Sequence, residues 1–166
     1  MTCLSITLFL TVALLLPAHA VDMKLKGIDG SIQHLSDFKG NWVVVNYWAT
    51  WCPPCVEEMP ELQSFHDDYE NRGAMVIGIN TELVSKDKLL EFLDNYFITY
   101  PVYTSPPLRD SALGSIPGLP TTFLISPQGN IEARKVGGVT REMIERFIEK
   151  WESNNQPNSS LALLER

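Results

Sequence analysis

Two runs of apolar, largely β-branched or aromatic residues stand out in the pattern of apolar and polar positions along the chain. They are residues 42–48 (WVVVNYW) and residues 74–80 (AMVIGIN). Because such a run leaves almost no polar face, it is typical of a strand that is covered on both sides. The pattern therefore predicts two central strands.

Between and after these strands the apolar positions take helical spacing. One helix is predicted from Pro53 to about Arg72, where Gly73 ends it, and a second begins at residue 85. A third runs from its N-cap Thr140 to Trp151. The apolar positions that repeat at helical spacing are Leu89, Leu90, Phe92, Leu93 and Phe97 in the second helix, and Met143, Ile144, Phe147, Ile148 and Trp151 in the third.

Shorter strands complete the pattern. Residues 23–36 and residues 121–136 each predict a hairpin, and residues 100–103 predict a strand after the second helix. The order predicts one α/β domain, residues 21–152, in which helices flank a central sheet. Residues 153–166 are polar and then briefly apolar, and we expect them to form a flexible tail.

The first twenty residues have a different character. Residues 4–16 are mainly apolar, and Ala18-His19-Ala20 has the small-x-small pattern that precedes signal-peptidase cleavage. We predict that residues 1–20 are a signal peptide and that the protein is periplasmic or otherwise extracytoplasmic. No Lys or Arg precedes the apolar stretch, so an uncleaved membrane anchor is the alternative, although the stretch is shorter than the roughly 20 residues of a spanning helix.

Charge narrows the choice of partner. The chain has 20 acidic and 13 basic residues, a formal net charge of −7, and no run of Lys or Arg. This balance argues against nucleic acid as a partner.

Cleavage after Ala20 would remove Cys3 and leave a mature chain with Cys52 and Cys55. A disulfide across two intervening residues closes almost no loop, so a purely structural bridge would stabilise little. A zinc site needs about four ligands, and beyond the two cysteines the mature chain offers His34, His66 and scattered carboxylates. Cu(I) tolerates two thiolates, so a copper-binding module is the alternative to a redox pair.

The position of Cys52 favours redox chemistry. It stands between a strand and a helix, where the helix dipole lowers a thiol pKa. Pro53 and Pro54 have no N–H, so we expect the Cys52 thiolate to face mainly the N–H of Cys55. A moderately lowered pKa predicts a dithiol that donates electrons.

The stretches WATWCPPCVEEMPEL and GLPTTFLISPQGNI together resemble the thioredoxin-like proteins of the TlpA, ResA and DsbE type. The resemblance covers nearly the whole mature chain. It implies a thioredoxin-like fold, a central mixed sheet flanked by helices, with an N-terminal β-hairpin and a helix-strand insertion before a cis-proline loop. A peroxidase on this fold is disfavoured, because no Pro-x-x-x-Thr-x-x-Cys leads to Cys52.

The resemblance implies thiol-disulfide exchange, usually the reduction of protein disulfides, without an organic cofactor or a metal. The implied substrates are apocytochrome c or copper-delivery proteins, and the implied electron donor is a membrane thiol reductase. By motif position, Cys52 is the attacking cysteine and Cys55 the resolving one. Pro120 matches the cis-proline of the family.

Three residues are predicted to bind substrate. Leu119 precedes Pro120, and its exposed backbone is placed to pair with an extended peptide. Thr121 follows Pro120, and Trp51 is expected to offer an apolar docking surface beside Cys52. Trp48, within the strand, is expected in the core.

Glu58 is the remaining candidate. At about 100° per residue it falls on the same helix face as Cys55 and Met59, whereas Glu57 points away. It also matches the buried acidic residue of the ResA-type proteins. A carboxyl group withdrawn from water beside the thiols should have a raised pKa and could relay a proton for Cys55. The alternative is that Glu58, like Glu57 and Glu61, lies on the solvated helix surface.

Overall fold

The computed structural model describes residues 20–107 and 109–155. Its elements are β1 (Lys24–Gly27), β2 (Ile32–His34), the 3-10 helix η1 (Leu35–Phe38), β3 (Trp42–Trp48), α1 (Pro53–Tyr69), β4 (Ala74–Asn80), α2 (Lys86–Asn95), β5 (Val102–Thr104), β6 (Asp110–Ser111), β7 (Gly114–Ser115), β8 (Thr121–Ile125), β9 (Ile131–Val136) and α3 (Arg141–Asn155). None of these helices is long and apolar enough to cross a membrane.

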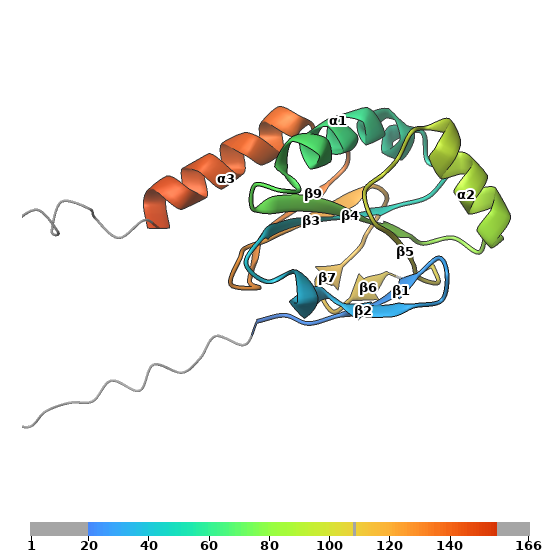
Figure 1. Ribbon diagram of the computed structural model, residues 1–166, viewed down its shortest axis with the longest axis horizontal. Coiled ribbons are helices and arrows are strands. Elements are labelled where there is room, and N and C mark those ends of the chain that lie inside the picture. The colour runs from blue at the N-terminus through green and yellow to red at the C-terminus, as the bar shows by residue number, and fades with distance from the viewer. Residues whose placement is uncertain (1–19, 108, 156–166) are drawn as a thin grey trace, which may run out of the picture.

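Seven strands form one mixed sheet in the order β2-β1-β5-β4-β3-β8-β9 (Figure 1). β3 is an inner strand of this sheet, parallel to β4 and antiparallel to β8. All seven residues of β3 are buried, which confirms the strand predicted from the run WVVVNYW. The hairpin β1–β2 and the unit α2–β5 are the two additions that the sequence predicts.

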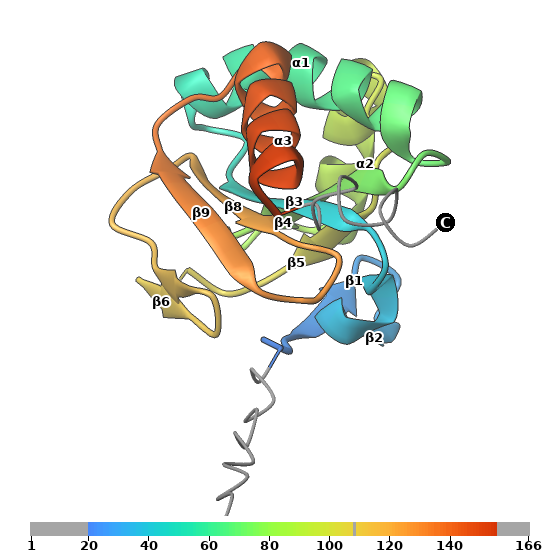
Figure 2. The ribbon, with the colours of Figure 1, turned by 90° about the vertical axis from the view of Figure 1, so that its left-hand side faces the viewer.

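The two faces of the sheet are covered differently. Figures 1 and 2 show α1, α2 and α3 on one face and β6 and β7 on the other, while the β1–β2 hairpin forms one edge of the sheet. Leu62 and Phe65 of α1 and Ile144 of α3 pack on Val44 and Val76 of the sheet. A second core on the opposite face joins inward residues of β3, β4 and β8 to Leu35, Leu113 and Ile116.

The second helix ends earlier than predicted. α2 stops at Asn95, and Phe97 lies outside it with φ of 55° and 83% of its surface exposed. The N–H of Ile98 donates to the carbonyl of Leu93 over this left-handed residue, which is how many helices terminate. Phe97 therefore does not belong to the buried helix face that the spacing predicts.

The third helix continues further than predicted. Thr140 caps it as expected, since its Oγ1 accepts the N–H of Met143, but α3 runs to Asn155. Ser153 and Asn155 bond the carbonyls of Lys150 and Trp151, so polar residues extend the last turn. Met143 is exposed at 41% rather than packed. The predicted signal peptide, up to residue 19, and the tail from residue 156 lie outside the described residues.

Candidate active site

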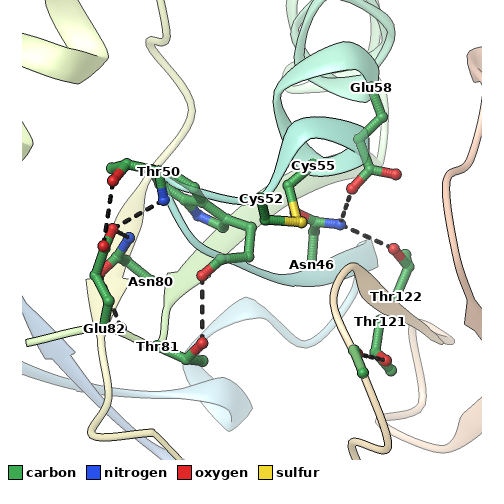
Figure 3. The surroundings of a disulfide bond; sticks show 12 residues. Asn46, Thr50, Cys52, Cys55, Glu58, Asn80, Thr81, Glu82, Thr121 and Thr122 are labelled. Carbon is green, nitrogen blue, oxygen red and sulfur yellow. Dashed lines mark hydrogen bonds between the residues drawn. A yellow bond between two sulfur atoms is a disulfide. The ribbon is translucent and has the colours of Figure 1, made fainter.

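Cys52 and Cys55 lie where the central strand passes into the first helix. Cys52 is the N-cap of α1 with an extended backbone, and two prolines occupy the first helical positions, as predicted. The two sulfurs form a disulfide, with the Cα atoms 5.3 Å apart (Figure 3). Both cysteines are almost fully buried, Cys52 being 3% exposed and Cys55 1%.

The backbone N–H of Cys55 has a backbone partner in the disulfide form. It donates to the carbonyl oxygen of Cys52 at 3.0 Å, and so does the N–H of Val56, at 3.2 Å. The prediction concerned the Cys52 thiolate of the reduced protein, and in the disulfide form this amide bonds the carbonyl oxygen of Cys52. With Pro53 and Pro54 also lacking N–H groups, the helix dipole is the main local influence left to favour a thiolate at Cys52.

The second predicted motif forms a loop at the start of β8. The Leu119–Pro120 peptide bond is cis, as predicted. The Pro120 carbonyl accepts the N–H of Gly137, and the hydroxyl of Thr121 donates to the carbonyl of Gly118 at 2.7 Å. Thr121 is fully buried, so its hydroxyl holds the loop rather than facing solvent.

Next to Trp51, the neighbour of Cys52 in the sequence, the surface is hollowed into a mainly apolar groove of about 570 Å³. Trp51 stands at its side with 67% of its surface exposed, whereas Trp48 is fully buried, as expected for the two tryptophans. The groove is lined by Trp51, Thr81, Glu82, Leu83, Pro107, Ile116, Gly118 and Leu119. Leu83 is 88% exposed, so the groove offers apolar side chains to a partner.

Glu58 is buried on the inner face of α1, with 3% of its surface exposed, while Glu57 is exposed. Its Oε1 accepts the side-chain N–H of Asn46 at 2.7 Å (Figure 3). Its Oε2 accepts the backbone N–H of Val139 at 2.8 Å. Burial raises the pKa of Glu58 to about 7, and these two hydrogen bonds oppose that rise. The predicted burial and the predicted direction of the pKa shift are both confirmed.

The hydrogen-bond partners of Glu58 are not among the residues predicted from the sequence. Asn46, from β3, also donates to Oγ1 of Thr122 in β8 at 2.9 Å, and both residues are buried. A signal was present, because Asn46 is the polar residue within WVVVNYW and a buried amide needs hydrogen-bond partners. Val139 contributes its backbone N–H, which no side-chain pattern indicates.

A second hydrogen-bonded cluster, also not predicted from the sequence, holds the turn that precedes Cys52. The carboxylate of Glu82 accepts the backbone N–H and the hydroxyl of Thr50 at 2.9 and 3.1 Å. Asn80, at the end of β4, donates to the same carboxylate at 2.8 Å. Figure 3 shows this cluster on the opposite side of the disulfide from Glu58. The turn between strand and helix is thus held from the neighbouring strand.

The histidines weighed as metal ligands lie in other pairings. His34 bonds Asp22, and His66 bonds Glu70. Over residues 20–107 and 109–155, no cluster of three or more His, Cys, Asp or Glu side chains has the arrangement of a metal site.

A disulfide that caps a helix and stands near a cis-proline loop supports thiol-disulfide exchange, and the fold places this chain among the thioredoxin-like thiol-disulfide oxidoreductases. More specifically, the chain belongs to the AhpC/TSA family, whose model matches residues 17–134.

Relatives and solved structures agree with this assignment. The chain is 32% identical over 131 residues to the thiol-disulfide oxidoreductase ResA of Halalkalibacterium halodurans, covering 79% of this chain and 74% of ResA. It is 36% identical over 136 residues to ResA of Oceanobacillus iheyensis, covering 78% and 69%. A DsbF homologue from Corynebacterium diphtheriae matches with a TM-score of 0.71 at 31% identity, covering 79% and 85%. A secreted thiol-disulfide isomerase from Corynebacterium glutamicum matches with a TM-score of 0.70 at 29% identity, covering 75% and 80%. The protein is therefore a thiol-disulfide oxidoreductase of the ResA and DsbE type.

Proposed function

We propose that this protein is an exported reductase of protein disulfides that uses Cys52 and Cys55 as its redox pair. The observation that carries the proposal is the placement of this pair at the N-terminus of α1, where Trp51 and the cis-proline loop line a mainly apolar groove. A disulfide with a purely structural role would not need a groove beside it. A redox pair that acts on a partner protein needs a groove in which an extended segment of that partner can bind.

The reaction begins with the reduced protein. The Cys52 thiolate attacks one sulfur of the substrate disulfide, forms a mixed disulfide and releases the other substrate sulfur as a thiolate. The Cys55 thiolate then attacks the Cys52 sulfur, which restores the Cys52–Cys55 disulfide and releases the second substrate thiolate. Two electrons pass from the protein to the substrate. A thiol donor must return them, and the proposed donor is a membrane thiol reductase.

The substrate segment is proposed to lie along the cis-proline loop. Leu119 is half-buried and lines the groove, and its backbone lies outside β8, free to pair with an extended peptide. Trp51 provides an exposed apolar face beside Cys52. Thr121 contributes indirectly, because its hydroxyl fixes the loop through Gly118.

Glu58 is proposed to accept the proton of the Cys55 thiol and to release it afterwards. Resolution needs Cys55 as a thiolate, and Glu58 lies one helical turn further along the inner face of α1. With a pKa of about 7 it can accept a proton from the thiol at neutral pH and release it afterwards. When ionised, it also raises the thiol pKa values by like-charge repulsion.

The proposed substrates are disulfides in apocytochrome c or in copper-delivery proteins, and the proposed location is extracytoplasmic. Both follow from the resemblance to the TlpA, ResA and DsbE type. The names of the relatives support the chemistry, and the Corynebacterium glutamicum structure is described as a secreted protein. The apolar stretch and Ala-His-Ala pattern at the N-terminus support export.

Two variants test this function. Cys52→Ser should abolish reduction of a protein disulfide, because no attacking thiol is left. Cys55→Ser in the native compartment should accumulate a mixed disulfide whose mass identifies the substrate. Undiminished reductase activity in Cys52→Ser would reject the assignment. Tight binding of one Cu(I) by both thiols, together with no reductase activity, would favour the copper-binding alternative.

A further inference from the structure

The hydrogen bonds around Glu58 suit one protonation state better than the other. In the part of the chain that the structure describes, its carboxyl oxygens meet two partners, and both are N–H donors: the side chain of Asn46 and the backbone of Val139. A carboxylate only accepts, so this arrangement suits the ionised form. A protonated carboxyl carries an O–H, which needs an acceptor.

Of the two partners, only Asn46 can change from a hydrogen-bond donor to an acceptor. A backbone N–H is fixed as a donor, whereas turning the Asn46 amide by half a rotation exchanges Nδ2 for Oδ1. Asn46 is 1% exposed and Glu58 3%, so bulk water is not at hand to replace a lost hydrogen bond. Within this cluster, the acceptor that can be offered to a protonated Glu58 is Oδ1 of Asn46.

Thr122 fits both orientations of the amide. Asn46 Nδ2 donates to Glu58 and to Thr122 Oγ1, at 2.7 and 2.9 Å, and Figure 3 shows the amide nitrogen between these two partners. A hydroxyl can accept or donate. If Oδ1 replaced Nδ2, the O–H of Thr122 would donate to it instead of accepting.

We infer that the Asn46 amide reverses when Glu58 takes up a proton. With Glu58 ionised, Nδ2 donates to Glu58 and to Thr122, and with Glu58 protonated, both O–H groups donate to Oδ1. Asn46 and Thr122 are then positioning residues, which let one buried site hold the carboxyl group in either state. The reversal is a property of the cluster itself, and only its consequence for turnover rests on the proposed proton relay.

Other titratable groups face this site. For Tyr100, from the segment before β5, burial and then the charge of Glu58 raise the pKa of the hydroxyl above its ordinary value. Cys55, on the same helix as Glu58, titrates once it is reduced. The disulfide form is therefore the right material for the test, because in it neither cysteine titrates and Tyr100 stays neutral.

The direct test uses NMR on the oxidised wild-type protein between about pH 8.5 and about pH 5.5, on either side of the Glu58 pKa of about 7. The cross-peak between the Asn46 side-chain amide protons and the Thr122 Cβ proton should be present at the higher pH and lost at the lower. Its loss should follow the carboxyl carbon shift of Glu58. A cross-peak that persists while Glu58 titrates would overturn the reversal.

Variants test the two residues in turnover. Asn46→Ala and Thr122→Val should displace the pH midpoint of disulfide reduction, whereas Thr122→Ser, which keeps the hydroxyl, should retain the wild-type midpoint. Asn41→Ala, at a half-buried asparagine whose amide bonds Phe38, is the control and should leave the midpoint unchanged. Equal midpoints for Thr122→Ser and Thr122→Val would remove Thr122 from the mechanism. If Glu58→Gln alone leaves turnover unaffected, the proton relay fails while the reversal seen by NMR stands.

Discussion

The carboxylate of Glu58 accepts the backbone N–H of Val139 at 2.8 Å, across 81 residues of sequence. Val139 lies between β9 and α3, so this bond ties the helix that carries the cysteines to the C-terminal part of the fold. It favours the ionised carboxyl, against the effect of burial, which raises the Glu58 pKa to about 7. Glu58 is thereby poised to change protonation state near neutral pH.

Replacing Glu58 with Gln should slow disulfide reduction by roughly 10²- to 10⁴-fold, because the relayed proton is lost. The step near pH 7 in the pH profile should disappear with it, because Gln cannot titrate. The exposed neighbour provides the control: Glu57→Gln should change neither rate nor profile. Stopped-flow reduction of a protein disulfide across pH measures both. Identical behaviour of the two variants would return Glu58 to a purely structural role.

The redox pair should be reducing. No histidine stands between the cysteines, and the amide of Cys55 is engaged by the Cys52 carbonyl, so little stabilises a Cys52 thiolate beyond the helix dipole. We expect a potential nearer to the roughly −270 mV of thioredoxin than to the roughly −120 mV of DsbA. Equilibration with glutathione measures it. Pro54→His should make the pair more oxidising, and a wild-type value close to that of DsbA would contradict the argument.

Acid should weaken the attachment of α1 to β4 through His66. Its Nδ1 accepts the N–H of Val76 at 3.3 Å, and its Nε2 lies 3.1 Å from the carboxylate of Glu70. Burial lowers the His66 pKa, against the opposing effect of Glu70 and Asp67, and the ring of Tyr100 packs beside it. The unfolded chain, with an ordinary pKa of about 6.5, then binds a proton that the folded protein does not. Stability from this group is therefore present above about pH 6.5 and lost as the pH falls.

His66→Asn keeps an acceptor for Val76 and cannot be protonated, so it isolates this effect. Urea unfolding of the variant and of the wild type at about pH 7.5 and about pH 5.5 should show a smaller loss of unfolding free energy in the variant. Glu58 acts in the opposite direction, because its raised pKa costs stability as the pH rises from 4.5 to about 7. That contribution is common to both proteins and cancels in the comparison. An equal acid loss in the two proteins would contradict the role of His66.

Gly78 should not tolerate a side chain. A Cβ there would lie 2.9 Å from Nε1 of Trp48 and 3.1 Å from Cε2 of Tyr100, both buried aromatic residues. Gly78→Ala should lower the free energy of unfolding by about 1–3 kcal/mol, as overpacking typically does. Gly118→Ala, with no atom within 4 Å of the added Cβ, is the matched control and should have little effect. Chemical denaturation distinguishes the two.

The fold was predictable because its central residues carry strong local signals. The strands β3 and β4 begin and end at the residues predicted, since covered strands produce continuous apolar runs. The end of α2 was missed because the spacing of apolar residues continues to Phe97, while the chain turns through a left-handed residue that is usually glycine. The short strands β6 and β7 have two residues each and leave no periodic pattern to detect.

The residues of the candidate site that lie close together at the start of one helix could be predicted from the sequence. Cys52, Cys55 and Glu58 share α1, so spacing alone places them on one side. Asn46, Thr122 and Val139 come from three other parts of the chain and meet only in the folded sheet. The periodicity of one helix or strand cannot predict contacts between different elements. A single amide side chain in a buried strand does indicate that it has a hydrogen-bond partner.

The contacts that complete the site also set when it can form. Asn46 meets Thr122 across 76 residues and Glu58 meets Val139 across 81, so both pairings close long loops and depend on residues made late in synthesis. A chain that has been synthesised only as far as β4 already carries both cysteines, but it lacks Thr122 and Val139. The surroundings of the redox pair are therefore completed by residues from the last third of the polypeptide, and a chain truncated before them would lack the hydrogen bonds that hold Glu58.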